Sequence, residues 1–355
     1  MNNNPIFIAG PDRSGTTLLY ALLASHPNIS MVRRTNMWRY FYRRYGDLSH
    51  PENFERCLTD MLRYKRMNHL QPDPRRIRTE FQQGEPTYGR LFALFHAHNA
   101  ERVGKLHWGD KSLHTEHYAD QVFAEFPDAK IINMTRDPRD RYASVRKRHG
   151  RDTPRLGGAT GRWLFSMKAA RRNLERYPHN YMIIQYEALV HNPEDVLRKV
   201  CEFIGEEFTP VMLSMDGAAD HRDSGGNSSF GQIKPGEIST RPIGRFRQVL
   251  SNSEIAFIQM CTGRDMEALG YQRDPVRFSL GEKLAFYMVD LPHNLARMLG
   301  WLNLTTIQLR RGEQIPAFRL VDASLATVEQ DITPPVRIEG KSPEAESMKE
   351  LIRGA

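Results

Sequence analysis

The chain has 355 residues and a basic balance, with a formal net charge of +8 and a pI near 9.4. A basic protein can meet nucleic acid, anionic nucleotides, acidic glycans or membrane surfaces. The sequence has no zinc-finger, helix-turn-helix or RNA-recognition signature, so we expect no nucleic-acid partner. Cys57, Cys201 and Cys261 lie too far apart for a disulfide framework or a metal cluster. With no bilayer-length apolar run and no room for a signal peptide before residue 5, we expect a soluble, cytoplasmic, bacterial protein.

Residues 5–25 predict a strand, a glycine turn and a helix, in that order. The apolar run Ile6 to Ala9 is typical of a buried strand, and leucines recur at helical spacing after Gly15. Such a turn aims backbone N–H groups and a helix N-terminus at one point, which favours a bound anion. The sequence therefore predicts an anion site at the start of the chain.

The spacing of Gly10, Gly15 and Thr17 matches a phosphate-binding P-loop. Thr16 stands where a nucleotide triphosphatase has the lysine that reaches the β- and γ-phosphates, and Arg13 supplies a cation earlier in the turn. We interpret the loop as a phosphate cradle built for something other than ATP hydrolysis.

The remaining elements alternate between strands and helices, which predicts a parallel sheet with helices on both faces. We expect strands at 29–32, within 105–112, at 129–134 and at 181–186, and helices at 114–126, up to about 148, at 159–177, 193–204 and 252–269. Ser251 and Gly270 have the chemistry of a helix N-cap and C′ residue. The predicted fold class is α/β, a P-loop-like three-layer sandwich with helical insertions and a helical C-terminal extension.

The predicted organisation is an α/β domain over 1–275, a helical extension over 276–322 and a loose tail over 323–355. Residues 37–100 form a helical insertion whose aromatic side chains we interpret as core and groove wall rather than a nucleic-acid platform. Residues 216–250 are loop-like. Residues 280–301 are amphipathic and broken near Pro292, and could touch a lipid surface or a second subunit, giving a homo-oligomer.

Arg136 follows a predicted buried strand, and Ser144 lies eight residues further on, with Arg148 on the same helical face. A guanidinium and hydroxyls at a helix start suit a dianionic phosphate. A solvated basic helix face would explain the charges but not their position directly after a buried strand. The sequence thus predicts a second phosphate site.

The loop sequence Arg13 to Leu18, Arg-Ser-Gly-Thr-Thr-Leu, resembles the 5′-phosphosulfate loop of sulfotransferases that use PAPS (3′-phosphoadenosine 5′-phosphosulfate). The pair Arg136 and Ser144 resembles the 3′-phosphate site of the same family, in its bacterial, Golgi and tyrosylprotein-type branch. The strand end around Tyr186 and the late loop at 226–247 also resemble the family. The resemblance covers about residues 5–270.

The resemblance implies PAPS as the sulfuryl donor, PAP as the product, and no metal. It implies that the nucleotide is bound by residues of the first loop, the second phosphate site and the late loop: Arg13, Ser14, Gly15, Thr16, Thr17, Arg136, Ser144, Arg148, Tyr186, Ser239, Thr240 and Arg245. Tyr186 could equally be a core tyrosine, and Arg245 could only cap a helix. Arg13 and Lys111 are the implied catalytic cations.

The general base is where the sequence departs from the family. Arg34 occupies the position at which the family usually has a glutamate, and an arginine cannot act as a base. The base could instead be Asp110 or His107, which we favour. Alternatively, the acceptor is acidic enough to lose its proton without a strong base, and Arg33 and Arg34 bind it as an anionic substrate. A third alternative is that the protein binds the nucleotide without transferring sulfate.

The acceptor is not identified by the sequence. A glycan, glycolipid, acidic peptide or small metabolite would suit the basic residues after the second strand. A P-loop kinase acting on a small molecule is the rival enzyme class, and Thr16 argues against it.

Overall fold

A computed structural model describes residues 4–149, 156–223, 234, 236–311 and 313–321, without the side chains of residues 148, 149 and 310. Five strands form one parallel sheet in the order β2-β3-β1-β4-β5. The strands are β1 (Ile6–Ala9), β2 (Ile29–Arg33), β3 (His107–Lys111), β4 (Lys130–Thr135) and β5 (Tyr181–Gln185). This sheet confirms the predicted α/β fold class.

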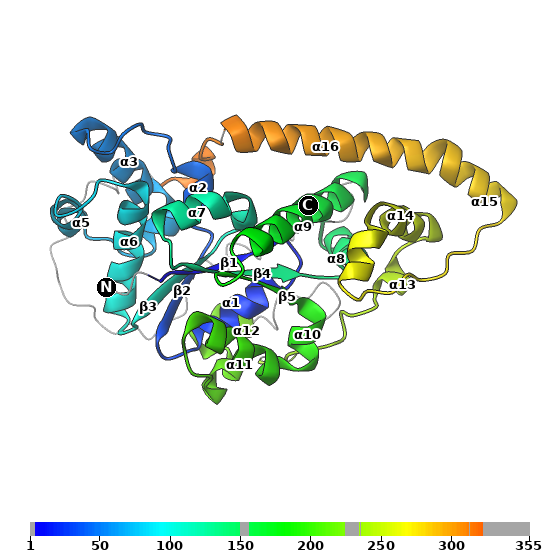
Figure 1. Cartoon of the computed structure of the whole chain (residues 1–355), viewed down its shortest axis with the longest axis horizontal. Helices are drawn as coiled ribbons and strands as arrows, with labels where there is room; N and C mark the ends of the chain where they lie inside the picture. The colour runs from blue at the N-terminus through cyan, green and yellow to red at the C-terminus, as the bar shows by residue number, and fades with distance from the viewer. Residues whose placement is uncertain (1–3, 150–155, 224–233, 235, 312, 322–355) are drawn as a thin grey trace, which may run out of the picture. The chain divides into compact units, whose positions relative to one another are not determined.

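Helices cover both faces of the sheet because each strand alternates its apolar side chains between two cores. Ile6 and Ile8 face one core with α1 (Thr16–Ala24), α10 (Tyr186–His191) and α11 (Pro193–Ile204). Phe7 and Ala9 face the other core with α6 (Tyr88–Arg102), α7 (Ala119–Glu125) and α9 (Leu156–Arg176). Figure 1 shows the two layers of helices with the sheet between them.

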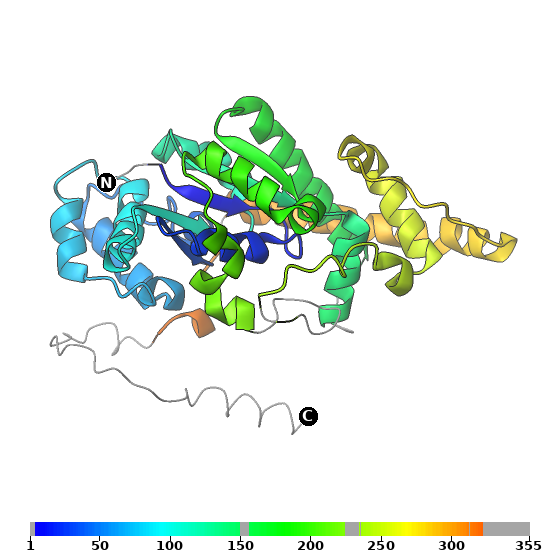
Figure 2. The ribbon, with the colours of Figure 1, turned by 90° about the horizontal axis from the view of Figure 1, so that it is seen from below.

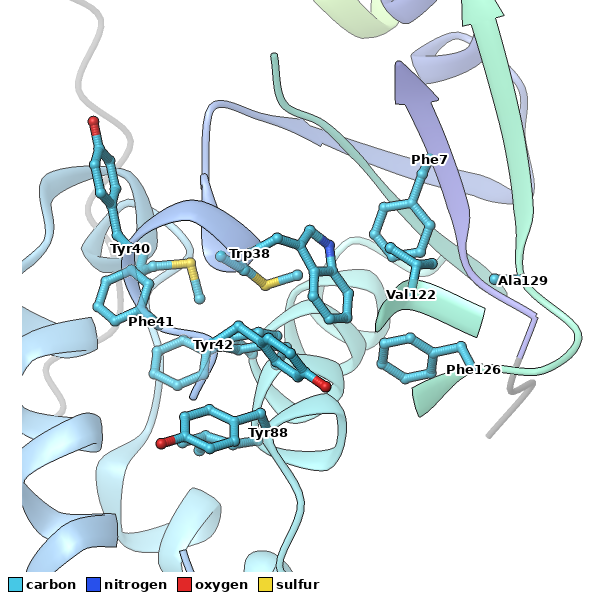
Figure 3. Close-up of a cluster of buried hydrophobic side chains, with 14 of the residues drawn as sticks. Phe7, Trp38, Tyr40, Phe41, Tyr42, Tyr88, Val122, Phe126 and Ala129 are labelled. Atoms are coloured by element: carbon cyan, nitrogen blue, oxygen red, sulfur yellow. The ribbon is translucent and has the colours of Figure 1, made fainter. Parts of the chain in front are cut away.

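The insertion between β2 and β3 is helical, with α2 (Met37–Tyr40), α3 (Pro51–Arg63), α4 (Lys65–Asn68), α5 (Pro74–Phe81) and α6. Trp38 packs edge-on against Phe7 of β1 and Phe92 of α6, with ring centroids 6.1 and 5.6 Å away (Figure 3). Only 4% of Trp38 is exposed. The aromatic run is therefore core, as predicted, and it fastens the insertion to the sheet.

The chain after β3 adds further helices. These are η1 (Thr115–Tyr118), α8 (Pro138–His149), η3 (Pro210–Ser214), η4 (Asp216–Ala218), α12 (Ala219–Asp223), α13 (Phe246–Val249), α14 (Asn252–Ala268) and η6 (Ala317–Arg319). Figures 1 and 2 both place the insertion, in blue and cyan, at one end of the sheet and α14, in yellow, at the opposite end. Ser251 and Glu254 form a capping box at the start of α14, as the N-cap prediction requires.

The predicted break near Pro292 is wrong. α15 (Leu280–Ala285) continues through a π-helical turn (Phe286–Asp290) into α16 (Leu291–Arg311). Pro292 is the second residue of α16, where its missing N–H costs little, and the wider π turn gives its ring room. No helix among the described residues is long and apolar enough to cross a membrane.

α16 lies along α9 because the start of α9 is made of small residues. A Cβ at Gly157 would stand 2.0 Å from the Asn294 carbonyl oxygen, and one at Gly161 would stand 3.0 Å from Met298. The Arg162 guanidinium covers the Trp301 ring at 5.5 Å. Glycine at these positions permits the close helix–helix approach. The predicted tail at 323–355 lies outside the described residues.

Candidate active site

The loop between β1 and α1 needs glycine at both ends. Gly10 has φ +115°, and a Cβ there would stand 2.2 Å from the Met134 carbonyl oxygen of β4. Gly15 has φ +87°, and a Cβ there would meet the Tyr186 ring at 2.5 Å. Arg13, between them, is also left-handed, with φ +66°. These close approaches, rather than spacing alone, explain the two glycines.

Asp12 holds the loop against two arginines that the sequence did not single out. Its carboxylate accepts hydrogen bonds from Arg141 at 2.6 Å and Arg162 at 3.0 Å, and its carbonyl accepts one from Arg141 at 2.9 Å. Burial alone would raise the pKa of Asp12, but the two guanidinium charges hold it well below its ordinary value. The loop is therefore fixed from α8 and α9.

A second carboxylate, Glu116, lies beneath the start of the loop and is fully buried. It accepts a hydrogen bond from the Gly10 N–H at 3.1 Å and another from the Ser166 hydroxyl at 2.6 Å. His114 and His117 are close enough that the ligand atoms of the three residues lie within 4.8 Å of one another, a set that could hold a metal ion. The sequence analysis had not singled out this cluster.

The two predicted phosphate sites meet through Arg13 and Arg136. Arg13 Nε donates to Ser144 Oγ at 2.9 Å, and Arg136 donates to the Arg13 carbonyl at 3.3 Å. The Arg136 guanidinium also lies over the Tyr186 ring at 4.5 Å and donates to the Pro242 carbonyl at 2.8 Å. Four predicted nucleotide-site residues from separate segments thus converge at one edge of the sheet.

Several side-chain polar atoms around this region are buried without a hydrogen-bond partner within the described part of the chain. Ser14 Oγ and Arg136 Nε are among them. A buried polar group without a partner is costly unless a ligand or water completes it. A hydroxyl and a guanidinium nitrogen are both donors that suit a phosphate oxygen. The donor set therefore fits an anionic ligand.

The late loop is fastened to α8 by Asp140, which the sequence analysis did not name. Its buried carboxylate accepts N–H hydrogen bonds from Gly244 at 2.6 Å and Phe246 at 2.9 Å. Ser239 is buried and Thr240 is exposed, whereas Arg245, which directly precedes α13, donates to the Gln248 side chain in that helix, 2.8 Å away. Residues 226–233 and the Arg148 side chain lie outside the described residues.

Lys111, at the end of β3, lies beside the loop. Its Nζ is 3.5 Å from Thr17 Oγ1, and the residue is 5% exposed. Burial lowers its pKa to about 8, with the charges of Arg34 and Arg33 acting in the same direction. Arg33 is the register partner of Lys111 on β2, and the Arg34 N–H donates to the Lys111 carbonyl at 2.9 Å. Three cations therefore gather at the ends of β2 and β3.

Asp110 is not placed to act as a base on an acceptor. It is fully buried and aligned with Phe7, so it points to the face of the sheet opposite Lys111. Its carboxylate accepts from the Ser112 hydroxyl at 2.6 Å, and Ser112 Oγ accepts the Asn36 N–H at 2.9 Å. Burial raises the pKa of Asp110 to about 6. The fold therefore does not bring the Asp110 carboxylate to the Lys111 side of the sheet; through Ser112 it contacts the turn after β2.

The fold does not bring His107, the other predicted base, to the cluster with Lys111. It begins β3, so it lies at the amino edge of the sheet, about 13 Å of strand from Lys111 at 3.3 Å per residue. Its ring Nε2 is 2.5 Å from Glu206 Oε1, at the end of the sheet away from the loop. Neighbours in sequence that share a strand can lie at opposite ends of it.

His221 of α12 is the histidine that the fold brings near Lys111. It is buried, and burial lowers its pKa, assisted by the charges of Arg33 and Lys111. A lowered pKa keeps the imidazole neutral and able to accept a proton at neutral pH. The sequence does not predict a role for His221, because residues 216–250 have a loop-like composition and no spacing links His221 to the strand ends.

A model of the sulfotransferase family matches residues 5–210. An uncharacterised protein of Aquifex aeolicus (strain VF5) is 24% identical over 215 residues, which are 57% of this chain and 25% of that protein. The chain thus spans about a quarter of that relative's length.

Two solved structures share the fold. The sulfotransferase domain from the Synechococcus PCC 7002 olefin synthase has a TM-score of 0.53 and 24% identity, covering 76% of this chain and 96% of that domain. The sulfotransferase domain from the curacin biosynthetic pathway has a TM-score of 0.51 and 19% identity, covering 76% and 99%. Because the family model matches more than half of the chain, the chain belongs to the sulfotransferase family.

Proposed function

We propose that the chain moves a sulfuryl group from PAPS to a hydroxyl or amine of an acceptor. The observation that carries the proposal is the junction of Arg13, Ser144 and Arg136, which joins the glycine loop to a second cluster of anion-binding groups. A nucleotide with phosphates at both ends would use both. The unpartnered Ser14 hydroxyl and Arg136 Nε support the same ligand.

Arg13 and Lys111 are the cations that would stabilise the negative charge on the transferring sulfuryl group. PAPS supplies an activated sulfuryl group, and sulfuryl transfer resembles phosphoryl transfer, in which catalysis is mainly positioning and charge neutralisation. Lys111 is held by burial within reach of Thr17, so its charge is fixed beside the loop without reorganisation. A cation prearranged in this way lowers the barrier more than a mobile one in water.

The acceptor hydroxyl must lose its proton as its oxygen forms the new bond to sulfur and the sulfur–oxygen bond to the nucleotide breaks. We propose His221 as the proton acceptor, because Asp110 and His107 are withdrawn from the cluster. A neutral, buried imidazole close to Lys111 and Arg33 suits this role. The protonated ring would be repelled by both cations, which favours return of the proton to solvent.

Two rival functions can be tested by measurements of ligand binding and of sulfate transfer. A small-molecule kinase would need the P-loop lysine that Thr16 replaces, and it predicts thermal protection by ATP with Mg²⁺. A nucleotide-binding homologue without activity would bind PAP tightly yet transfer no labelled sulfate from PAPS to acceptors in a cell extract.

Calorimetry with PAP tests the donor site. We expect Arg136→Ala to weaken PAP binding by about 2 kcal/mol, the range for a hydrogen bond to a charged group. Ser144→Ala serves as a second variant, because it removes the hydroxyl that Arg13 contacts and leaves the Arg136 packing in place. Arg198→Ala, an exposed arginine of α11, is the matched control. No PAP binding by the wild type, or unchanged affinity in both variants, would refute the proposal.

A further inference from the structure

We propose that His114, Glu116 and His117 bind a zinc ion beneath the loop between β1 and α1, at a site separate from the proposed transfer chemistry. The ligand atoms of the three side chains, two imidazole nitrogens and a carboxylate oxygen, all lie within 4.8 Å of one another. Two imidazoles and one carboxylate are a set that Zn²⁺ accepts in proteins, with a fourth position left for water. Mg²⁺ and Ca²⁺ prefer oxygen ligands. The chemistry of the set therefore favours a transition-metal ion.

The local backbone brings the two histidines together. His114 is the N-cap residue of the 3₁₀ helix η1, and His117 is the third residue of that helix. Side chains three positions apart are nearly eclipsed in a 3₁₀ helix, which has three residues per turn. The two rings accordingly lie close to parallel, at an angle of 25°, with their centroids 6.0 Å apart. The 3₁₀ turn thus sets the two imidazoles beside each other.

The spacing of the ligand atoms is close to what zinc needs. His117 Nε2 is 3.7 Å from Glu116 Oε1. With zinc–ligand bonds of about 2.1 Å, the ligand atoms of a tetrahedral site stand about 3.4 Å apart. Since no two ligand atoms of the set are more than 4.8 Å apart, the widest separation has to shrink by about 1.4 Å. Small rotations of the side chains can supply a shift of this size.

Glu116 is held by hydrogen bonds that leave its carboxylate able to bind an ion. Oε2 accepts from the Gly10 N–H at 3.1 Å, and Oε1 accepts from the Ser166 hydroxyl at 2.6 Å. The Asn173 side-chain amide donates to the Glu116 carbonyl at 2.7 Å. Each oxygen of an ionised carboxylate has two lone pairs, so one hydrogen bond on each oxygen leaves room for a metal. Ligating carboxylates in metal sites are usually hydrogen-bonded in this way, because the neighbours fix their orientation.

The cluster is enclosed on one side and accessible on the other. Glu116 is fully buried and the His117 side chain is 6% exposed, whereas His114 is partly exposed. An ion could therefore enter past His114 and be shielded from water by the protein around Glu116.

Arginines near the cluster do not prevent a cation from binding, because most of them are ion-paired. Those that act electrostatically on the three side chains include Arg39, Arg141, Arg162 and Arg172. Arg141 and Arg162 both pair with Asp12, and Arg39 pairs with Glu313. Much of this positive charge is therefore offset before an ion enters, and Glu116 adds a negative charge at the site itself.

An ion bound here would have a structural role and would add no step to the proposed transfer. The Glu116 carboxylate connects Gly10, at the start of the loop, with Ser166 of α9. A metal ion would fix this carboxylate, and with it both contacts. We therefore expect zinc to stabilise the fold around the loop.

Equilibrium dialysis of the full chain, first stripped of metal with a chelator, tests the site. We expect one zinc ion per chain with a Kd of about 1 μM or less, and much weaker binding of Mg²⁺. Zinc should also raise the melting temperature of the stripped protein, because a ligand that binds only the native state stabilises it. This comparison needs no variant.

Variants then locate the ion. His114→Gln and His117→Gln should each weaken zinc binding about a hundredfold or more, because each removes one of three ligands. Ser166→Ala should weaken it about tenfold, because it leaves the ligands in place and removes one support of the carboxylate. His69→Gln, at an exposed histidine, is the matched control and should leave zinc binding unchanged. Circular dichroism checks that each variant is folded.

Three results would overturn the proposal. One is a wild-type protein that shows no saturable zinc binding, which would leave the three side chains as a buried hydrogen-bonded cluster. Another is equal zinc binding by the wild type and both histidine variants, which would assign the ion to other residues. The third is Mg²⁺ binding as tight as that of zinc. Loss of zinc binding in folded His114→Gln protein, with His69→Gln unchanged, would support the site.

Discussion

The carboxyl edge of the sheet has two sides that are built differently. On the loop side, formed by β1, β4 and β5, the cations are cross-linked: Arg13 to Ser144, Arg136 to two carbonyls, and Arg141 to Asp12. On the acceptor side, formed by β2 and β3, Lys111 is buried beside Thr17 and Arg33 lies over the Tyr20 ring, whereas the Arg34 side chain is exposed. The loop side is the more extensively cross-linked of the two.

The contrast fits the roles proposed for the two sides. A rigid site suits a ligand that never changes, because prearranged groups lose little freedom when the ligand binds. Loops and strand ends tolerate variation in a ligand better than cross-linked loops do. The loop side is therefore expected to lose stability when it is altered, and the acceptor side to lose activity or affinity with the fold intact.

Lys111→Met should give the largest effect, because it removes a cation at the boundary between the two sides. Transfer of labelled sulfate from PAPS to acceptors in a cell extract should fall about 10² to 10³-fold, the usual cost of one electrostatic donor. Calorimetry should show PAP affinity changed little. A parallel loss of PAP binding would mean that Lys111 belongs to the loop side instead.

Asp12→Ala should destabilise the protein by about 3 kcal/mol, since it leaves the buried Arg141 without its charged partner. The free energy of unfolding in urea measures this effect. Asp220→Ala is the matched control on the acceptor side, because the exposed Asp220 should contribute less than about 0.5 kcal/mol. Equal losses in the two variants would remove the proposed difference between the sides.

The pH dependence of transfer should give the smallest effect. Lys111 has a pKa of about 8, so it loses its charge as pH rises, and the rate should fall about tenfold per pH unit above that value. On the acid side, burial and two cations lower the pKa of His221, so the rate should persist as pH falls to the ordinary histidine range. Lys111→Arg should move the alkaline limb upward, since arginine stays charged. An unmoved alkaline limb would assign it to another group.

The sequence predicted the fold well because its strongest signals are local. The apolar runs of β1 and β4, the glycines of the first loop and the capping box at Ser251 each depend on neighbours within a few residues. The break expected near Pro292 does not occur, because a π turn at Phe286–Asp290 directly before the proline lets the helix continue. A π turn has no plain sequence signal. The α10 helix at the end of β5 was likewise not anticipated.

The residues of the candidate site also differ in whether they have a local sequence signal. Arg13, Arg136 and Ser144 could be named because each stands at a strand end or a helix start, and parallel strands bring those positions to one edge. His107 and Asp110 were named for their closeness to Lys111 in sequence, but strand length and alternation carry them to the opposite end and the opposite face. His221 had no local signal, because only the packing of α12 brings it under the influence of the Arg33 and Lys111 charges.

The sequence by itself determined the order of strands and helices along the chain, the glycine loop after β1 and the family to which the chain belongs, because these depend on spacing along the chain. Tertiary structure alone decided which charges share a site. Whether Asp12 pairs with Arg141, or His221 feels the charge of Lys111, depends on the packing of segments more than a hundred residues apart in the sequence. Electrostatic interactions act through space, so their partners cannot be read from the distance along the sequence.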